Sequence, residues 1–170
     1  MIKKETLAKN GLSYDETVKY AEDTLFAAKL IYCSESFYYL KNEYLYYYRQ
    51  VDCSRSKLYE VGLWKQYCHL CDAFFSFFSG KGHGFEDQIH ALVIYYAGIT
   101  LRKVNLYQGS FFDKYRIRKE IINSDLLRNA FQHYKVPKCD NNFIWKQKVL
   151  ILLIKYRMTL LYGICVSEVT

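Results

Sequence analysis

The spacing of apolar residues predicts a helical hairpin in the middle of the chain. From Val61 to Phe78, apolar side chains recur every three or four residues along two adjacent rows, which predicts a helix buried on most sides. A second stripe of the same period runs from Phe85 to Thr100. Three glycines in the segment 79–84 separate the two stripes, so we expect two consecutive helices joined by a flexible connector.

The first third of the chain has a mixed pattern. Residues 2–9 are expected to form the end of a helix, which the Asn10-Gly11 pair stops. An apolar run without a breaker predicts a helix of roughly ten residues from Asp23 to near Tyr32. Two aromatic runs then flank a short polar gap over residues 37–48, which indicates a hairpin or two successive strands.

Two further helical regions are expected near the end of the chain. One covers about 114–134 and is interrupted at Asn123-Ser124, where Ser124 is placed to cap a new start. The last covers about 143–165, and its apolar centre is followed at once by Lys155 and Arg157. The uninterrupted run is far shorter than the ~18–20 residues that span a bilayer, so we do not expect a transmembrane helix. The predicted fold class is therefore α+β and mostly helical.

Composition and charge narrow the class of protein. Half of the residues are hydrophobic (51%), which excludes disorder for most of the chain. Lys and Arg number 24 against 17 Asp and Glu, a net charge of +7 that suits a phosphate-bearing ligand, nucleic acid or an anionic membrane surface. We expect no nucleic-acid partner, because the charge is spread along the chain and no helix-turn-helix or zinc-finger spacing is present. No signal peptide precedes the chain, so we expect a cytoplasmic protein with six reduced cysteines.

The adjacent carboxylates Glu22 and Asp23 are the first candidate for chemistry. Neighbouring helical residues diverge by about 100°, so the two do not face each other as a hydrolase pair must. One of them, at the start of a helix, is kept ionised by the backbone amides and can accept a proton from an attacking hydroxyl. Plain helix capping by an acidic residue is the alternative interpretation.

Four other features have a functional and a structural interpretation. Cys68-x-x-Cys71 has the spacing of a metal or redox motif, but both cysteines lie on an apolar stripe and suit a core. The glycines of the segment 79–84 lack a phosphate-loop sequence and suit a connector. Tyrosines ending in Arg49 suit either a nucleotide-stacking surface or a half-buried strand. The basic, apolar segment 143–165 suits an anionic membrane surface or an ordinary core helix.

Four short motifs follow one another in the first third of the chain. They are Asn10-Gly11-Leu12-Ser13-Tyr14-Asp15-Glu16, Glu22-Asp23-Thr24-Leu25-Phe26, Leu45-Tyr46-Tyr47-Tyr48-Arg49 and Ser54-Arg55-Ser56. Their order and spacing resemble the second half of the catalytic domain of family 2 glycosyltransferases, bacterial enzymes that build capsular, O-antigen and exopolysaccharide chains. The resemblance covers residues 1–56, and the helical remainder, 57–170, is similar to the variable C-terminal extension of these enzymes.

The resemblance implies the C-terminal portion of a GT-A fold, with short strands near 37–49. It also implies an inverting transfer of a sugar from a nucleotide-diphosphate donor to a hydroxyl of a glycan acceptor. Asp23 matches the family's general base, Glu22 helps to hold the acceptor, and Arg49, Ser54 and Arg55 match the donor side.

The family's amino-terminal half has no counterpart in these residues. That half carries an Asp-x-Asp motif for Mg²⁺ or Mn²⁺, and no Asp-x-Asp occurs in the 170 residues. We therefore expect no cofactor in this chain and a metal only in a full-length enzyme. We also expect a fragment that is inactive alone and self-associates through the apolar flank left open.

The sequence thus supports two hypotheses from different classes. The first is a fragment of a polysaccharide-building glycosyltransferase, located in the cytoplasm at the inner face of the membrane. The second is a non-catalytic helical module that binds a membrane surface or a protein partner through residues 143–165.

Overall fold

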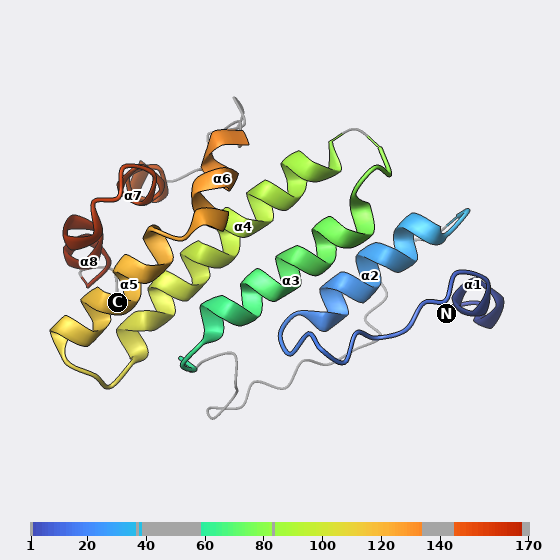
Figure 1. Ribbon diagram of the computed structural model, residues 1–170, viewed down its shortest axis with the longest axis horizontal. Helices are drawn as coiled ribbons and strands as arrows, with labels where there is room; N and C mark the ends of the chain where they lie inside the picture. Colours follow the sequence, from blue (N-terminus) through green and yellow to red (C-terminus); the bar gives the residue numbers. More distant parts are fainter. Residues whose placement is uncertain (1, 37, 39–58, 83, 134–144, 168–170) are drawn as a thin grey trace.

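The computed structural model describes residues 2–36, 38, 59–82, 84–133 and 145–167 (Figure 1). Within these ranges the chain forms eight α-helices and one short 3-10 helix, and it contains no strand. The prediction of a mostly helical protein is confirmed. The hairpin predicted over 37–48 and the strands expected near 37–49 lie outside the described residues, apart from Tyr38.

An antiparallel hairpin of two long helices forms the centre of the molecule (Figure 1). Helix α3 spans Leu63–Phe78 and α4 spans Phe85–Lys103. The connector contains Gly80 and ends at Gly84, and both adopt positive φ angles (70° and 93°) that glycine tolerates best. The predicted hairpin and connector are confirmed.

The prediction placed Val61 on the first helix, and this was wrong. Val61 is 76% exposed and precedes the helix. The reason is Gly62, whose left-handed conformation (φ 86°) turns the chain at the N-cap of α3.

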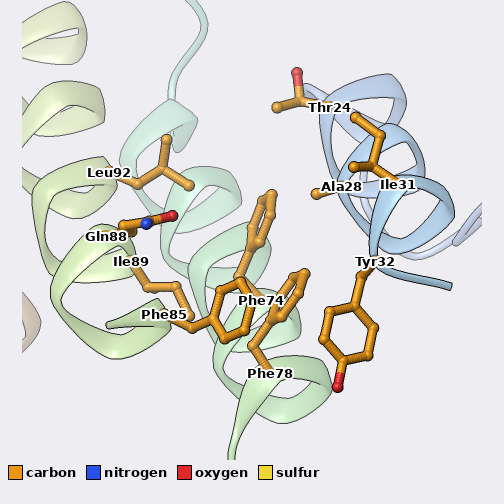
Figure 2. A pocket seen from close by; sticks show the side chains of 10 residues that line it. All are labelled: Thr24, Ala28, Ile31, Tyr32, Phe74, Phe78, Phe85, Gln88, Ile89 and Leu92. Carbon is orange, nitrogen blue, oxygen red and sulfur yellow. The ribbon is translucent and has the colours of Figure 1, made fainter. Parts of the chain in front are cut away.

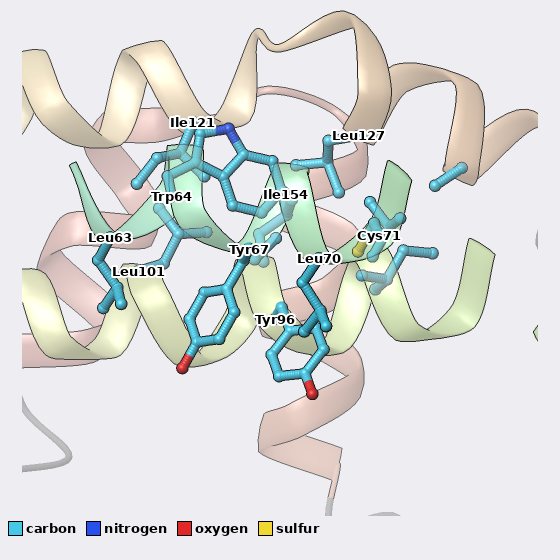
Figure 3. Packing of buried hydrophobic residues seen from close by; sticks show 14 of the residues in the cluster. Leu63, Trp64, Tyr67, Leu70, Cys71, Tyr96, Leu101, Ile121, Leu127 and Ile154 are labelled. Atoms are coloured by element: carbon cyan, nitrogen blue, oxygen red, sulfur yellow. The ribbon is translucent and has the colours of Figure 1, made fainter. Parts of the chain in front are cut away.

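The core forms where several helices meet the central hairpin (Figure 3). Helix α3 alone buries seven side chains: Leu63, Trp64, Tyr67, Leu70, Cys71, Phe74 and Phe78. Their removal from water is the main force that holds the hairpin together. Val18 and Leu25 from the first third of the chain belong to the same buried cluster.

Helices α1 (Lys4–Lys9) and α2 (Glu22–Cys33) precede the hairpin, and α2 packs beside α3 (Figure 1). Helix α1 ends as predicted, with Gly11 in the left-handed region (φ 59°). The N–H of Leu12 donates to the carbonyl of Leu7 (2.9 Å), and that of Gly11 donates to Ala8 (3.3 Å). These two bonds satisfy the last carbonyls of the helix.

Helices α5 (Phe111–Ile122) and α6 (Asp125–His133) pack against the other side of α4, after the 3-10 helix η2 (Val104–Leu106). The break expected at Asn123-Ser124 is confirmed. Helix α5 begins three residues earlier than predicted, because Ser110 and Asp113 form a reciprocal capping box.

The single last helix predicted over 143–165 is wrong. The chain instead forms α7 (Trp145–Lys155) and α8 (Thr159–Ser167), separated by a turn at Arg157. Arg157 takes a left-handed φ of 57°. The N–H of Met158 donates to the carbonyl of Leu153 (2.9 Å), which is the same helix-ending arrangement that Gly11 makes after α1. Among the described residues, no helix is both long and apolar enough to cross a bilayer.

Candidate functional site

An apolar groove of about 410 Å³ lies between α2 and the α3–α4 hairpin (Figure 2). Helix α2 forms one wall, and α3 and α4 form the other. The lining residues are mostly aliphatic or aromatic: Thr24, Ala28, Ile31, Tyr32, Phe74, Phe78, Phe85, Gln88, Ile89 and Leu92. A concave surface of this kind suits the apolar part of a ligand, since binding removes that part from water.

The predicted carboxylates directly precede Thr24, the first residue of α2 that lines this groove. Glu22 and Asp23 are the first two residues of α2 and both are exposed. Asp23 Oδ1 accepts hydrogen bonds from the backbone N–H of Thr24 (2.7 Å) and from its hydroxyl (3.3 Å). Thr24 lines the groove, so the Asp23 carboxylate is hydrogen-bonded to a residue of the groove wall. Asp23 does not cap the helix, because the N-cap residue is Ala21.

Ala21 holds a strained conformation next to these carboxylates. Its φ and ψ of 55° and 31° are left-handed, a region that costs an L-residue with a Cβ roughly 1–2 kcal/mol. Helices α3 and α4 also begin after a left-handed residue, but there the residue is glycine (Gly62 and Gly84). Strained backbone of this kind is common at functional sites, where the surrounding structure holds it in place.

Two tyrosines stack in the core, and one of them, Tyr96, lies within electrostatic reach of Asp23. The rings of Tyr67 and Tyr96 are 4.3 Å apart, nearly parallel, and buried in the core (Figure 3). Burial raises the pKa of Tyr96 to about 12, and the charges of neighbouring groups that include Asp23 add to the rise. Tyr96 therefore stays protonated at neutral pH.

Two lysine side chains lie over the rings of Tyr32 and Phe77, and Tyr32 is a residue of the groove wall. Lys81 Nζ lies 3.3 Å from the ring centroid of Phe77 and 5.5 Å from that of Tyr32. Lys29 Nζ lies 5.3 Å from the Phe77 centroid. Such cation–π contacts hold the ammonium groups over the aromatic rings. Lys81 is thus placed against Tyr32, a residue of the groove wall.

The other sites predicted from the sequence are separate from this groove. Arg49, Ser54 and Arg55 lie outside the described residues. Cys71 is in the core and Cys68 packs against it, which confirms the structural interpretation of the Cys-x-x-Cys pair. Burial raises the pKa of Cys68 to about 11 and of Cys71 to about 12, so both remain thiols at neutral pH. Among the described residues, no group of three or more His, Cys, Asp and Glu side chains has the geometry of a metal site.

A polar cluster that the sequence analysis did not predict joins Asp15, Thr17 and His69. The Thr17 hydroxyl donates to Asp15 Oδ1 (2.6 Å) and lies 2.9 Å from His69 Nε2. Hydrogen bonds from Thr17 hold the pKa of Asp15 below its usual value. Because the single hydroxyl proton goes to Asp15, the histidine donates to Thr17 and does not activate it as a nucleophile. The cluster ties the segment before α2 to α3.

No protein-family model, curated protein or solved structure matches this chain. The resemblance of residues 1–56 to family 2 glycosyltransferases therefore stays a prediction. The site itself consists of the Glu22–Asp23 pair, the strained Ala21 before it and the apolar groove behind Thr24.

Proposed function

We propose that this chain provides the acceptor side of a family 2-like glycosyltransferase, with Asp23 as the general base. The observation that supports the proposal best is the position of Asp23: an exposed carboxylate in the first turn of α2, next to a residue that lines the groove. The left-handed conformation of Ala21 immediately precedes the first turn of α2.

In the proposed reaction, the acceptor places its apolar part in the groove and one hydroxyl at the entrance. Asp23 accepts the hydroxyl proton as the oxygen attacks the anomeric carbon of the donor sugar. The bond from that carbon to the nucleoside diphosphate breaks, and the configuration is inverted. Hydrogen bonds from the backbone N–H and the hydroxyl of Thr24 hold the Asp23 carboxylate in place, and Glu22 holds a second acceptor hydroxyl.

The donor site is expected from sequence outside these 170 residues. The described residues offer no set of ligands that fits Mg²⁺ or Mn²⁺, so we derive no step through a metal. Translating the DNA upstream of the Met1 codon tests this part of the proposal. A reading frame with alternating strands and helices and an Asp-x-Asp motif is the expected result, and unrelated sequence there would contradict it.

The role of Asp23 is tested in the enzyme assembled with that donor half. Asp23→Asn should reduce sugar transfer by at least about a hundredfold, because the base is lost, while binding of the nucleotide sugar is unchanged. Glu35→Gln is the matched control, because Glu35 is an exposed carboxylate that follows the other end of α2 and lies outside the four motifs. Turnover retained in Asp23→Asn, or lost equally in Glu35→Gln, would refute the assignment.

A further inference from the structure

The first turn of α8 exposes an unusual amount of apolar surface. Met158, Leu160 and Leu161 are 43%, 53% and 44% exposed. They line one hollow of about 430 Å³ together with Arg157 and with Lys119 of α5. We refer to these five residues as the α8 patch.

The charged residues that line the hollow of the α8 patch are both basic. Residues 145–167 contain four basic side chains and no acidic ones. The nearest carboxylate in the sequence of α5 is Glu120, which lies close enough to Tyr59 to contribute to its raised pKa, after burial as the main cause. Tyr59 packs edge-on against Tyr107, outside the hollow. Among the residues that line the hollow, the charged ones are therefore the two cations Lys119 and Arg157, beside Tyr115, Asn123 and Thr159.

The backbone at Arg157 supports a role for its positive charge. The left-handed conformation (φ 57°) that ends α7 is one that glycine adopts without strain, as Gly11 does after α1. An arginine at this position costs stability and gains nothing for the turn itself. What the arginine adds is a cation at the edge of an exposed apolar patch.

We propose that the α8 patch binds an anionic lipid surface. Leucine and methionine side chains enter the boundary between headgroups and acyl chains, and the two cations contact lipid phosphates. A second copy of the chain fits less well, because a twofold contact would bring Lys119 and Arg157 of both copies together without a carboxylate to pair them. This inference does not depend on the proposed glycosyltransferase function.

Vesicle co-sedimentation of the full chain tests the proposal. The probe is phosphatidylcholine vesicles with about one third phosphatidylglycerol, compared with pure phosphatidylcholine. We expect binding at least about tenfold stronger to the anionic vesicles, and weaker binding as salt rises, because ions screen the headgroup contacts. No binding, or equal binding to both kinds of vesicle, would overturn the proposal.

Matched variants locate the binding surface. Leu160→Gln with Leu161→Gln, and Lys119→Glu with Arg157→Glu, should each lower binding at least about tenfold. Lys9→Glu with Lys65→Glu makes the same change in net charge on exposed side chains of α1 and α3, and should have a much smaller effect. An equal loss in this control would show that net charge alone drives binding, and the assignment to α8 would be refuted.

A third variant guards against misfolding. Arg157→Gly relieves the strained turn, so it keeps the fold while removing one cation, and it should raise the melting temperature while lowering vesicle binding. Wild-type vesicle binding by this variant would contradict the role of Arg157. Light scattering without lipid tests whether two copies of the chain associate through the patch. If the wild type is a dimer and the variant with both Leu160→Gln and Leu161→Gln is a monomer, the patch is a self-interface and the proposal is overturned.

Discussion

At the scale of single residues, the backbone conformation of Ala21 is the clearest local conflict between residue type and structure. Ala21 is left-handed at the start of α2, where α3 and α4 use glycine. Ala21→Gly should therefore raise the free energy of unfolding by about 1 kcal/mol. Urea denaturation measures the change. The control is Ala27→Gly, an exposed position inside the same helix, which should lower stability by about 1 kcal/mol. The same sign in both variants would contradict the assigned conformation.

The buried histidine His90 makes stability depend on pH. Its ring stacks on His133 of α6 (4.7 Å between centroids) and packs against Phe75 of α3, and its Nδ1 has no partner among the described residues. Burial, followed by repulsion from His133, lowers its pKa, and Asp87 and Glu86 oppose this. His90 is therefore protonated near pH 6.5 in the unfolded state but only at a lower pH in the folded state.

Stability from His90 is thus present above about pH 6.5 and is lost as pH falls through the lower folded-state pKa. Urea denaturation at pH 7.5 and 5 should show this loss in the wild type and a smaller one in His90→Phe. If the free energy of unfolding falls between pH 7.5 and 5 by the same amount in His90→Phe as in the wild type, groups other than His90 cause the pH dependence.

At the scale of elements, Asn105 holds three of them together. Its side chain accepts a hydrogen bond from Arg118 of α5, its amide reaches the carbonyl of Val166 in α8 (3.5 Å), and its own carbonyl accepts from Lys114 (3.0 Å). Arg118 is only 4% exposed. Asn105→Ala leaves this buried guanidinium without the bond, so it should cost about 2 kcal/mol.

Chemical denaturation of Asn105→Ala measures this cost against Asn123→Ala. Asn123 makes one exposed side-chain bond to the Lys119 carbonyl, so its loss should cost less than about 1 kcal/mol. Equal losses in the two variants would show that the buried contact carries no special weight.

The elements that sequence predicts well are those with local signals. The α3–α4 hairpin follows from apolar spacing and three connector glycines, and the end of α1 follows from Asn10-Gly11. The break between α7 and α8 has no such signal, because an arginine takes the position at which glycine would have announced it. The early start of α5 was hidden by Phe111 and Phe112, which are exposed and form no core-facing stripe.

The candidate site around Glu22 and Asp23 could be predicted only in part, because part of it has no local signal in the sequence. The position of Glu22 and Asp23 at a helix start follows from the sequence around them. The groove depends on how α2 packs against two helices that lie far along the chain, and no local pattern encodes that arrangement. The strain at Ala21 had no signal either, since alanine is common in helices.

At the scale of the whole molecule, stability should be unevenly distributed. Helix α1 buries no residue, whereas α4 buries eight. In hydrogen exchange, the amides of α4 should be the slowest and those of α1 among the fastest, since α1 can open without exposing the core. Removal of residues 2–9 should accordingly leave the melting temperature nearly unchanged. A large drop would mean that α1 makes a contribution that its exposure conceals.

The order of folding follows from the same arrangement. The two central helices are consecutive and their connector is short, so they can pair early, whereas α2 must find a partner farther along the chain. Leu70 of α3 and Leu25 of α2 are equally buried. In stopped-flow experiments, Leu70→Ala should slow folding, and Leu25→Ala should mainly speed unfolding. If instead Leu25→Ala slowed folding and Leu70→Ala mainly sped unfolding, α2 would belong to the folding nucleus.

The short connector between α3 and α4 also matters while the protein is being made. The ribosome releases α2 before the hairpin exists, and a helix of twelve residues is marginal in water by itself. During synthesis, α2, which carries Asp23, therefore has no packing partner until α3 and α4 have emerged. The groove can form only after that point, because α3 and α4 supply its other wall.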